Sequence, residues 1–166
     1  TQGYSSAASD VYKRQSLSLT EKIGLNCYID LSQNIINDIT TFLVVKCVSN
    51  EQTIPLSSLE NISAGKYKLS YPVSAAKMND NISVQIICRG KKLAEENVSV
   101  KKYTDYILQH QNDNIDYKKA VPVVKAMLNY GGYAQQYFKY NISNPVNKGL
   151  YLSLIHISEP TRQAEI

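Results

Sequence analysis

Apolar and polar residues alternate along several short stretches of the first two thirds of the chain. The alternation is clearest over residues 22–31, where every second side chain from Ile23 to Leu31 is apolar. A period of two places one face of a strand in a core and the other in water. The same pattern predicts further strands over residues 66–73 and 82–88, and a hairpin turn after the latter predicts a return strand over 92–100. Residues 41–48 are apolar on both faces until Lys46, as expected of a more central strand, and a shorter strand is expected over 52–56. Pro55 should keep the short strand over 52–56 at a sheet edge.

The spacing of these strands indicates a fold class. Short strands about ten residues apart, separated by Gly, Asn and Asp, are typical of an antiparallel sandwich. We therefore expect an α+β protein with a β-sandwich, immunoglobulin-like in a loose sense, over residues 16–100. A helical segment over residues 101–151 should pack on it.

After Val100 the spacing of apolar residues lengthens to three and four, which predicts helices. We expect a pair of helices over residues 102–110 and 120–140. The longer helix should contact the sandwich through Val121, Val124, Leu128 and Phe138.

Three residues disturb the pattern of the long helix. Pro122 forfeits a helical hydrogen bond, so the helix either begins near Ala120 or is preceded by a separate turn. Gly131 and Gly132 are costly inside a helix. We prefer close backbone packing at this point as the explanation, with a kink as the alternative.

Both ends of the chain resemble translated sequencing-adapter DNA. One adapter strand, GAT GTG TAT AAG AGA CAG, encodes Asp10–Gln15, and its reverse complement encodes Leu152–Ile157. Unrelated protein segments have almost no chance of sharing codons in this way. We therefore expect residues 1–15 and 152–166 to be non-native, and we exclude them from the fold prediction.

The charge distribution argues against a nucleic-acid partner. The net charge is +4, and lysine pairs such as Lys91–Lys92 and Lys118–Lys119 are separated by acidic or apolar residues. Such a distribution is more typical of a solvated surface than of a continuous basic stripe. No stretch of eighteen apolar residues is present, so we expect no membrane insertion.

Cysteine and histidine usage argues against a metal site. Cys27, Cys47 and Cys88 are widely spaced, no CxxC occurs, and His110 is the only histidine of residues 16–151. We expect neither a metal nor another cofactor. Buried free thiols are the preferred interpretation, and one disulfide with one free thiol remains open.

No catalytic constellation accompanies His110. Asp105 or Asp113 could orient it as a general base, but no nucleophile elbow or phosphate-binding glycine loop is present. A single histidine at a helix end more often faces solvent or the helix dipole. Glu95 and Glu96 are adjacent on a predicted strand and should face opposite sides. We therefore do not expect an enzyme.

Tyrosines are concentrated in the C-terminal part. Tyr130, Tyr133, Tyr137 and Tyr140 are the candidate ligand or interface contacts, because a tyrosine ring combines a flat apolar face with a polar tip. The preferred interpretation, however, is that these rings fill the helix–helix and helix–sheet seam with their hydroxyls at the rim, rather than forming a binding platform.

The stretch AMLNYGGYAQQYFKYN, residues 126–141, resembles a motif of the type AMLNYGAYAQ-x-YF-x-YN. This motif belongs to an uncharacterised C-terminal module of large secreted or surface proteins of gut Clostridia. KIGLNCYIDL (22–31), YPVSAAKMNDNISVQI (71–86) and VSVKKYTDYIL (98–108) resemble the same module. Gly132 stands where the motif usually has alanine.

The resemblance implies an extracellular or cell-surface location and partners among other domains of the same polypeptide. We therefore expect a non-catalytic accessory module that serves as a spacer or in adhesion or binding, with a glycan or a host or cell-wall surface as the candidate partner. The first alternative is a carbohydrate-binding module using exposed tyrosines, and the second is a fragment of a hydrolase.

Overall fold

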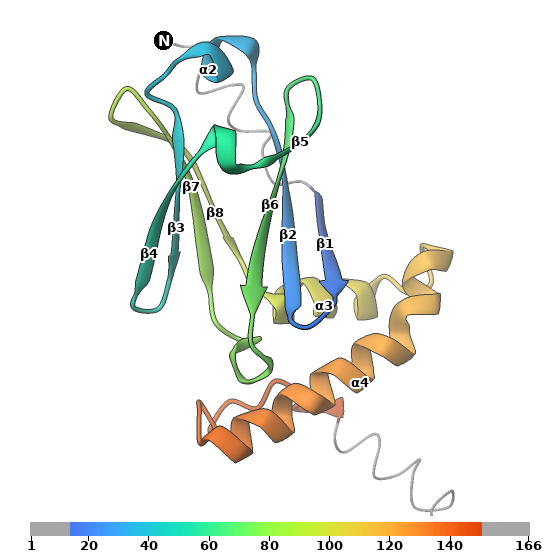
Figure 1. Ribbon diagram of the computed structural model, residues 1–166. Helices are drawn as coiled ribbons and strands as arrows, with labels where there is room; N and C mark the ends of the chain where they lie inside the picture. Colours follow the sequence, from blue (N-terminus) through green and yellow to red (C-terminus); the bar gives the residue numbers. More distant parts are fainter. Residues whose placement is uncertain (1–13, 151–166) are drawn as a thin grey trace, which may run out of the picture. The chain divides into compact units, whose positions relative to one another are not determined.

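The computed structural model describes residues 14–150 (Figure 1). This part of the chain divides into two compact units. The sheet unit consists of residues 14–73 and 80–103. The helical unit consists of residues 74–79 and 104–150. Each unit is described by itself.

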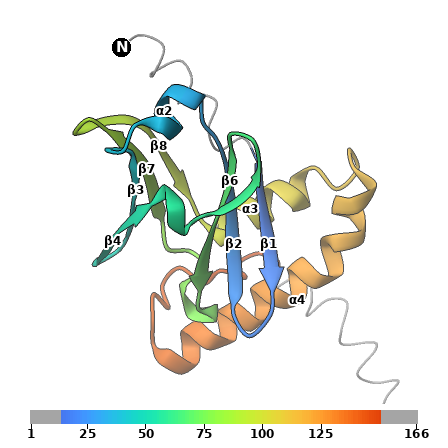
Figure 2. The same ribbon diagram turned by 45° about the horizontal axis from the view of Figure 1, so that its top comes forward.

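The sheet unit contains two four-stranded antiparallel sheets (Figures 1 and 2). The first has the order β1-β2-β6-β5, with bounds Arg14–Leu19, Ile23–Asp30, Lys66–Val73 and Glu60–Ser63. The second has the order β4-β3-β7-β8, with bounds Asn50–Pro55, Phe42–Cys47, Ile82–Cys88 and Lys91–Val98. Short helical segments are α2 (Gln33–Asn37), η1 (Leu56–Ser58) and, in the helical unit, η2 (Ala75–Lys77).

The strands predicted from alternation are confirmed. β2 and β6 pair in full register from Ile23–Val73 to Asp30–Lys66. β4, which contains Pro55, lies at a sheet edge as expected. The mixed α and β content with antiparallel pairing also agrees with the expected class.

Two strands, β1 and β5, and the short helical segments α2, η1 and η2 were not predicted. Residues 60–63 form β5, and residues 64–65 turn. The four residues of β5 are all exposed and lack apolar alternation. The strand is therefore defined by its hydrogen-bonded pairing with β6 and not by its composition.

The apolar side chains that alternate along the strands form the core of the sheet unit. Leu25 and Ile29 of β2, and Leu43, Val84 and Ile86 of the other sheet, are fully buried. Period-two burial on central strands of both sheets shows that each sheet turns one apolar face inward.

Gly65 makes the β5–β6 turn possible. Its φ of +75° is in the left-handed region, and a Cβ there would lie 2.9 Å from the carbonyl oxygen of Leu31. That strand end is held by a hydrogen bond from the Leu31 amide to the Gly65 carbonyl, at 2.8 Å. Glycine satisfies both constraints at once.

The three cysteines form no disulfide with one another, and the preferred interpretation of buried thiols holds for two of them. Cys27 and Cys88 are buried and Cys47 is half-buried. Burial, and secondarily the charge of Glu96, raises the pKa of the Cys27 thiol to about 12. Cys27 is therefore a thiol at neutral pH, with little nucleophilic character.

The two helices are α3 (Val100–Gln109) and α4 (Ile115–Phe138). The predicted start of the long helix near Ala120 was wrong, because α4 begins five residues earlier. Asn114 is its N-cap, and its side chain accepts a hydrogen bond from the Asp116 amide at 2.8 Å. Pro122 lies inside the helix, whose N-terminal part is bent in both views (Figures 1 and 2).

Close backbone packing explains the glycine pair of α4, as preferred over a kink. A Cβ on Gly131 would lie 2.8 Å from Val146 Cγ1 and 3.0 Å from both the Ala75 carbonyl oxygen and Met78 Cε. A Cβ on Gly132 would collide with the side chain of Asn147. The pair lets η2 and the C-terminal loop approach the helix.

The predicted contact stripe of the long helix is only partly correct. Val124 and Leu128 are buried and Val121 is half-buried, but Phe138 is 67% exposed. Phe138 is the last residue of α4 and rests edge-to-face on Tyr137, with 5.0 Å between ring centroids. The buried face continues instead through Gly131, Gly132, Ala134 and Gln135.

Two residues of the expected N-terminal adapter segment, Arg14 and Gln15, lie in β1 opposite Tyr28 and Cys27. Residues 1–13, and residues 152–166 of the expected C-terminal adapter segment, lie outside the described residues. Within residues 14–150 no helix has the length and hydropathy needed to cross a membrane.

Candidate functional site

Three of the four candidate tyrosines form a row on α4. Tyr130, Tyr133 and Tyr137 are 65%, 63% and 81% exposed. Their spacing of three and four residues places them on one side of the helix, over about 10 Å of its axis. The neighbouring residues Gly131, Ala134 and Gln135 are buried on another side. We call Tyr130, Tyr133 and Tyr137 the tyrosine row.

Tyr140 does not belong to the row. α4 ends at Phe138, and the left-handed conformation of its C-cap Lys139 (φ 53°) turns the chain. Tyr140 is half-buried, and the Lys77 ammonium lies 5.5 Å from its ring centroid. This cation–π contact joins η2 to the end of the long helix. Of the four predicted contacts, the structure therefore brings three together and separates the fourth.

Gln135 fixes the loop that follows α4. Its side-chain Nε2 donates to the carbonyls of Asn141 and Asn144 at 3.2 and 3.1 Å, and its Oε1 accepts from the Val146 amide at 2.7 Å. The side chain is 1% exposed, so these three bonds satisfy a buried amide. They fold the loop back along the buried side of the helix. This side of the helix holds the structure, whereas the tyrosines lie on the exposed side.

Two further hydrogen bonds hold the same loop. Asn147 Nδ2 donates to Asn129 Oδ1 at 3.1 Å, and Asn79 Nδ2 donates to the Asn144 carbonyl at 2.7 Å. The polar residues of the stretch 126–141 thus include two, Asn129 and Gln135, that hold the helical unit together.

His110 follows α3 and is held by its own helix. Its Nδ1 lies 2.9 Å from the Tyr106 carbonyl oxygen, and its ring stacks on the Tyr106 ring with 4.0 Å between centroids. Tyr117 meets the Tyr106 ring edge-on. The Asp113 amide donates to the His110 carbonyl at 3.0 Å, which is a main-chain turn.

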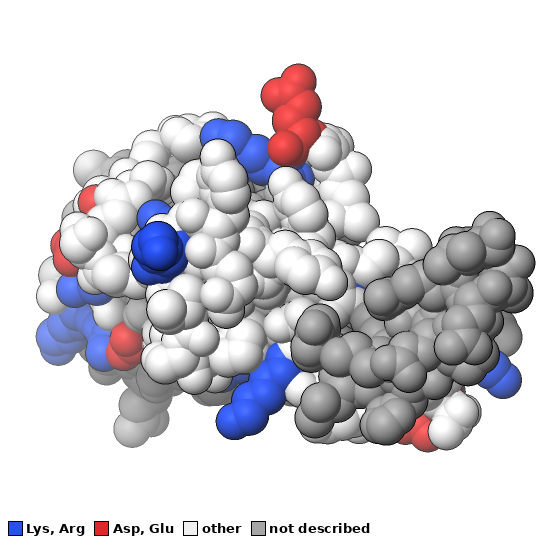
Figure 3. Space-filling model, turned by 90° about the horizontal axis from the view of Figure 1, so that it is seen from below, with Lys and Arg blue, Asp and Glu red and all other residues white. Residues whose placement is uncertain are grey.

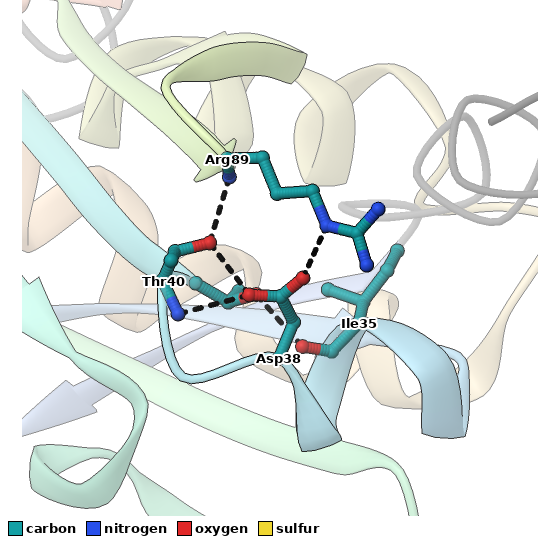
Figure 4. Close-up of polar contacts among 5 residues, drawn as sticks. Ile35, Asp38, Thr40 and Arg89 are labelled. Atoms are coloured by element: carbon teal, nitrogen blue, oxygen red, sulfur yellow. Dashed lines mark hydrogen bonds and ion pairs between the residues drawn. The ribbon is translucent and has the colours of Figure 1, made fainter.

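Asp38 is the centre of a polar cluster that the sequence pattern did not reveal (Figure 4). Its Oδ1 accepts from the Thr40 amide and hydroxyl at 3.0 and 2.6 Å, and its Oδ2 pairs with Arg89 Nε at 2.7 Å. The Thr40 hydrogen bonds, and then Arg89, hold the pKa of Asp38 well below its usual range.

The Asp38 cluster has a structural role. The Arg89 amide also donates to the Thr40 hydroxyl at 2.8 Å, so both ends of Arg89 engage the loop between α2 and β3. Arg89 has a φ of 53° in the β7–β8 turn. The cluster therefore joins this turn to the α2–β3 loop across 51 residues of sequence.

The two adjacent glutamates of β8 face opposite sides, as predicted. Glu95 accepts from Ser83 and Gln85 at 2.8 and 3.1 Å and pairs with Lys92. Lys92 first, then Ser83 and Gln85, lower the pKa of Glu95 to about 2. The charge of Glu96 instead contributes to the raised pKa of the buried Cys27 thiol.

Within residues 14–150 no three His, Cys, Asp or Glu side chains are grouped closely enough to hold a metal ion. Comparison with protein-family models, with curated proteins and with solved structures finds no significant match to the chain. A function for the chain can therefore be inferred only from the geometry of the described residues.

Sequence analysis identified the tyrosines by their number and type but not their separation. Two features decide which rings are exposed: α4 stops at its C-cap Lys139, and Tyr140 pairs with Lys77. Lys77 lies 63 positions before Tyr140 in the sequence. The helical period gave the tyrosine row. A long-range contact removed Tyr140 from it.

Proposed function

We propose that the protein is a non-catalytic accessory module of a bacterial extracellular or cell-surface protein and binds a ligand through the tyrosine row. The single observation that supports a binding role is the exposure of Tyr130, Tyr133 and Tyr137 on a helix whose other side is buried. Three large aromatic rings on one side of a helix form an apolar patch with polar tips, which suits a ring-bearing ligand.

The proposal extends to location and fold. The resemblance of residues 126–141 to modules of secreted and surface proteins supports an extracellular setting. The alternating burial along β2, β6 and β7 supports a sandwich of two sheets, immunoglobulin-like in a loose sense. The packing of the helical pair on these sheets stays a prediction.

Carbohydrate binding is the binding role that the row favours. Tyrosine rings stack on the C–H faces of sugars, and their hydroxyls can bond sugar hydroxyls. Gln136, exposed one residue from Tyr137, adds an amide donor and acceptor. A spacer would give no reason for this concentration of exposed rings.

A glycan array tests the proposed function. The full chain should bind at least one glycan class, and the double variant Tyr133→Ala, Tyr137→Ala should lose that binding by tenfold or more, about 1.4 kcal/mol. The control is Ile39→Ala, which removes a fully exposed apolar side chain of the sheet unit. A chain that binds no glycan, or a double variant that binds like the control, contradicts the proposal.

A further inference from the structure

The lysines of the helical unit have an uneven distribution. From Tyr117 to Leu150 the chain contains five lysines and no aspartate or glutamate. They are Lys118, Lys119, Lys125, Lys139 and Lys148. The last acidic residue before this stretch, Asp116, lies in the first turn of α4. The part of α4 that carries the tyrosine row therefore has positive charge only.

The sheet unit differs in this respect. Lys46 pairs with Glu51 at 3.0 Å, and Lys68 pairs with Glu60 at 2.6 Å. These lysines meet carboxylates of neighbouring strands. The positive charge near the tyrosine row has no acidic residue of its own helix beyond the first turn to balance it, and it is available to attract an anion.

Two lysines bracket the tyrosine row. Lys125 precedes Tyr130 by five residues, and Lys139 follows Tyr137 by two. At a rise of 1.5 Å per residue the two lysines are about 20 Å apart along the axis, with the three rings between them. Lys139 is exposed, and Lys125 is half-buried about a third of a turn to one side of the row. A long flexible lysine stem allows each ammonium to reach a ligand lying on the rings.

We infer that this surface binds a carboxylate-bearing polysaccharide, a polyuronate, in extended form. The three rings stack on successive sugar rings, and Lys125 and Lys139 pair with uronate carboxylates at either end. Opposite charge supplies attraction at long range, while stacking supplies contact area. The inference rests on the proposed function and names the class of ligand for the same surface.

Other occupants fit the surface less well. A second copy placed symmetrically on it would bring lysines against lysines. Polyol phosphate polymers lack rings to cover three tyrosines. Nucleic-acid binding favours dense basic charge, but the described arginines, Arg14 and Arg89, both lie in the sheet unit. On the face seen in Figure 3 several basic side chains lie beside acidic ones, and the basic side chains form no continuous stripe.

Titration calorimetry of the full chain with polygalacturonate tests the inference. The comparison probes are fully methyl-esterified polygalacturonate, a neutral β-glucan, a glycerol phosphate polymer and a single-stranded oligothymidylate. The variants are Tyr133→Ala and the double variant Lys125→Gln, Lys139→Gln. The matched control is Lys66→Gln, which removes an exposed lysine of β6.

We expect polygalacturonate to bind, esterification to weaken binding at least tenfold, and a rise in salt from 50 to 500 mM to weaken it further. Tyr133→Ala should weaken binding about tenfold and the lysine double variant about fivefold, with Lys66→Gln unchanged. Equal binding of the esterified or neutral polymer, tighter binding of the phosphate polymer or the oligothymidylate, or an unaffected lysine double variant overturns the inference. Binding of a neutral glycan through the tyrosines would overturn it while leaving the proposed function intact, and binding of no glycan would overturn both.

Discussion

At the residue scale, Gly131 and Gly132 are adjacent on α4 but meet different kinds of neighbour. A Cβ on Gly131 would press on the Ala75 main-chain oxygen and on Val146, both fixed by the fold. The three atoms nearest to a Cβ on Gly132 all belong to the amide end of the Asn147 side chain. A flexible side chain can move where a backbone cannot, so equal changes at the two positions should have unequal effects.

We predict that Gly131→Ala lowers the free energy of unfolding by about 1–3 kcal/mol, because the packing around Ala75 must open. Gly132→Ala should change it by less than about 1 kcal/mol. The higher helix propensity of alanine, ~1 kcal/mol, offsets the loss of the Asn147–Asn129 hydrogen bond. Urea denaturation measures both. A Gly132→Ala variant that is less stable than Gly131→Ala would show that the packing is assigned to the wrong glycine.

At the scale of elements, Gln135 connects α4 to its following loop. We predict that Gln135→Met lowers the free energy of unfolding by about 1–3 kcal/mol, because the buried Val146 amide loses its partner and the carbonyls of Asn141 and Asn144 each lose one of their two donors. Methionine keeps the volume and the helix propensity. Limited proteolysis should then cut first within residues 141–147.

Gln136→Met is the matched control for this prediction, because Gln136 is the exposed neighbour on the same helix. It should leave both the unfolding free energy and the proteolytic pattern within error of the parent chain. Similar losses in the two variants would mean that the loop is not held by the Gln135 amide.

The elements differ in how far the sequence predicted them. β2, β6 and β7 have an apolar residue at every second position, and burial on one side is enough to define such strands. β5 has no such pattern, and α2 is only five residues long. The early start of α4 could have been found from Asn114, an N-cap residue two positions before Asp116, whereas Pro122 directed the prediction to a later start.

The candidate site was predictable to the extent that helical geometry alone decides it. Tyr130, Tyr133 and Tyr137 follow the three-and-four spacing, and they are exposed together. The exposure of the Tyr140 and Phe138 side chains depends on where α4 ends and on what covers that end. Neither is encoded in a local period, so Phe138 was wrongly placed in the buried stripe, and the separation of Tyr140 from the tyrosine row was not predicted.

At the scale of the whole molecule, the free energy of unfolding should depend on pH in the acidic range. The pKa of Glu95 falls from its ordinary 4.5 to about 2, and that of Asp38 is also lowered. A carboxylate with a depressed folded-state pKa stabilises the fold above its unfolded-state pKa, and this contribution is lost as pH falls through the folded-state value. We predict that the unfolding free energy decreases from about pH 4.5 down to pH 2.

Glu95→Gln and Asp38→Asn should each flatten this acid limb, measured by urea denaturation between pH 2 and 7. Glu21→Gln, a change in the exposed turn between β1 and β2, serves as the control and should leave the slope of the parent chain. An acid limb of equal slope in all three variants would show that neither ion-pair cluster carries the pH dependence.

The account assigns structure-holding contacts to the buried side of α4 and ligand contact to its exposed side. Gln135, Gly131 and Asn129 belong to the first group, and the tyrosine row to the second. This division lets the exposed rings be changed without loss of the fold, which the binding experiments require.

Tyrosine nitration mapped by mass spectrometry, with and without polygalacturonate or a neutral β-glucan, tests the central claim most directly. The account predicts that Tyr130, Tyr133 and Tyr137 are nitrated well before the buried Tyr67, and that at least one of the polysaccharides protects all three. Slow nitration of the three rings in the absence of polysaccharide, or protection at tyrosines of the sheet unit instead, would contradict it.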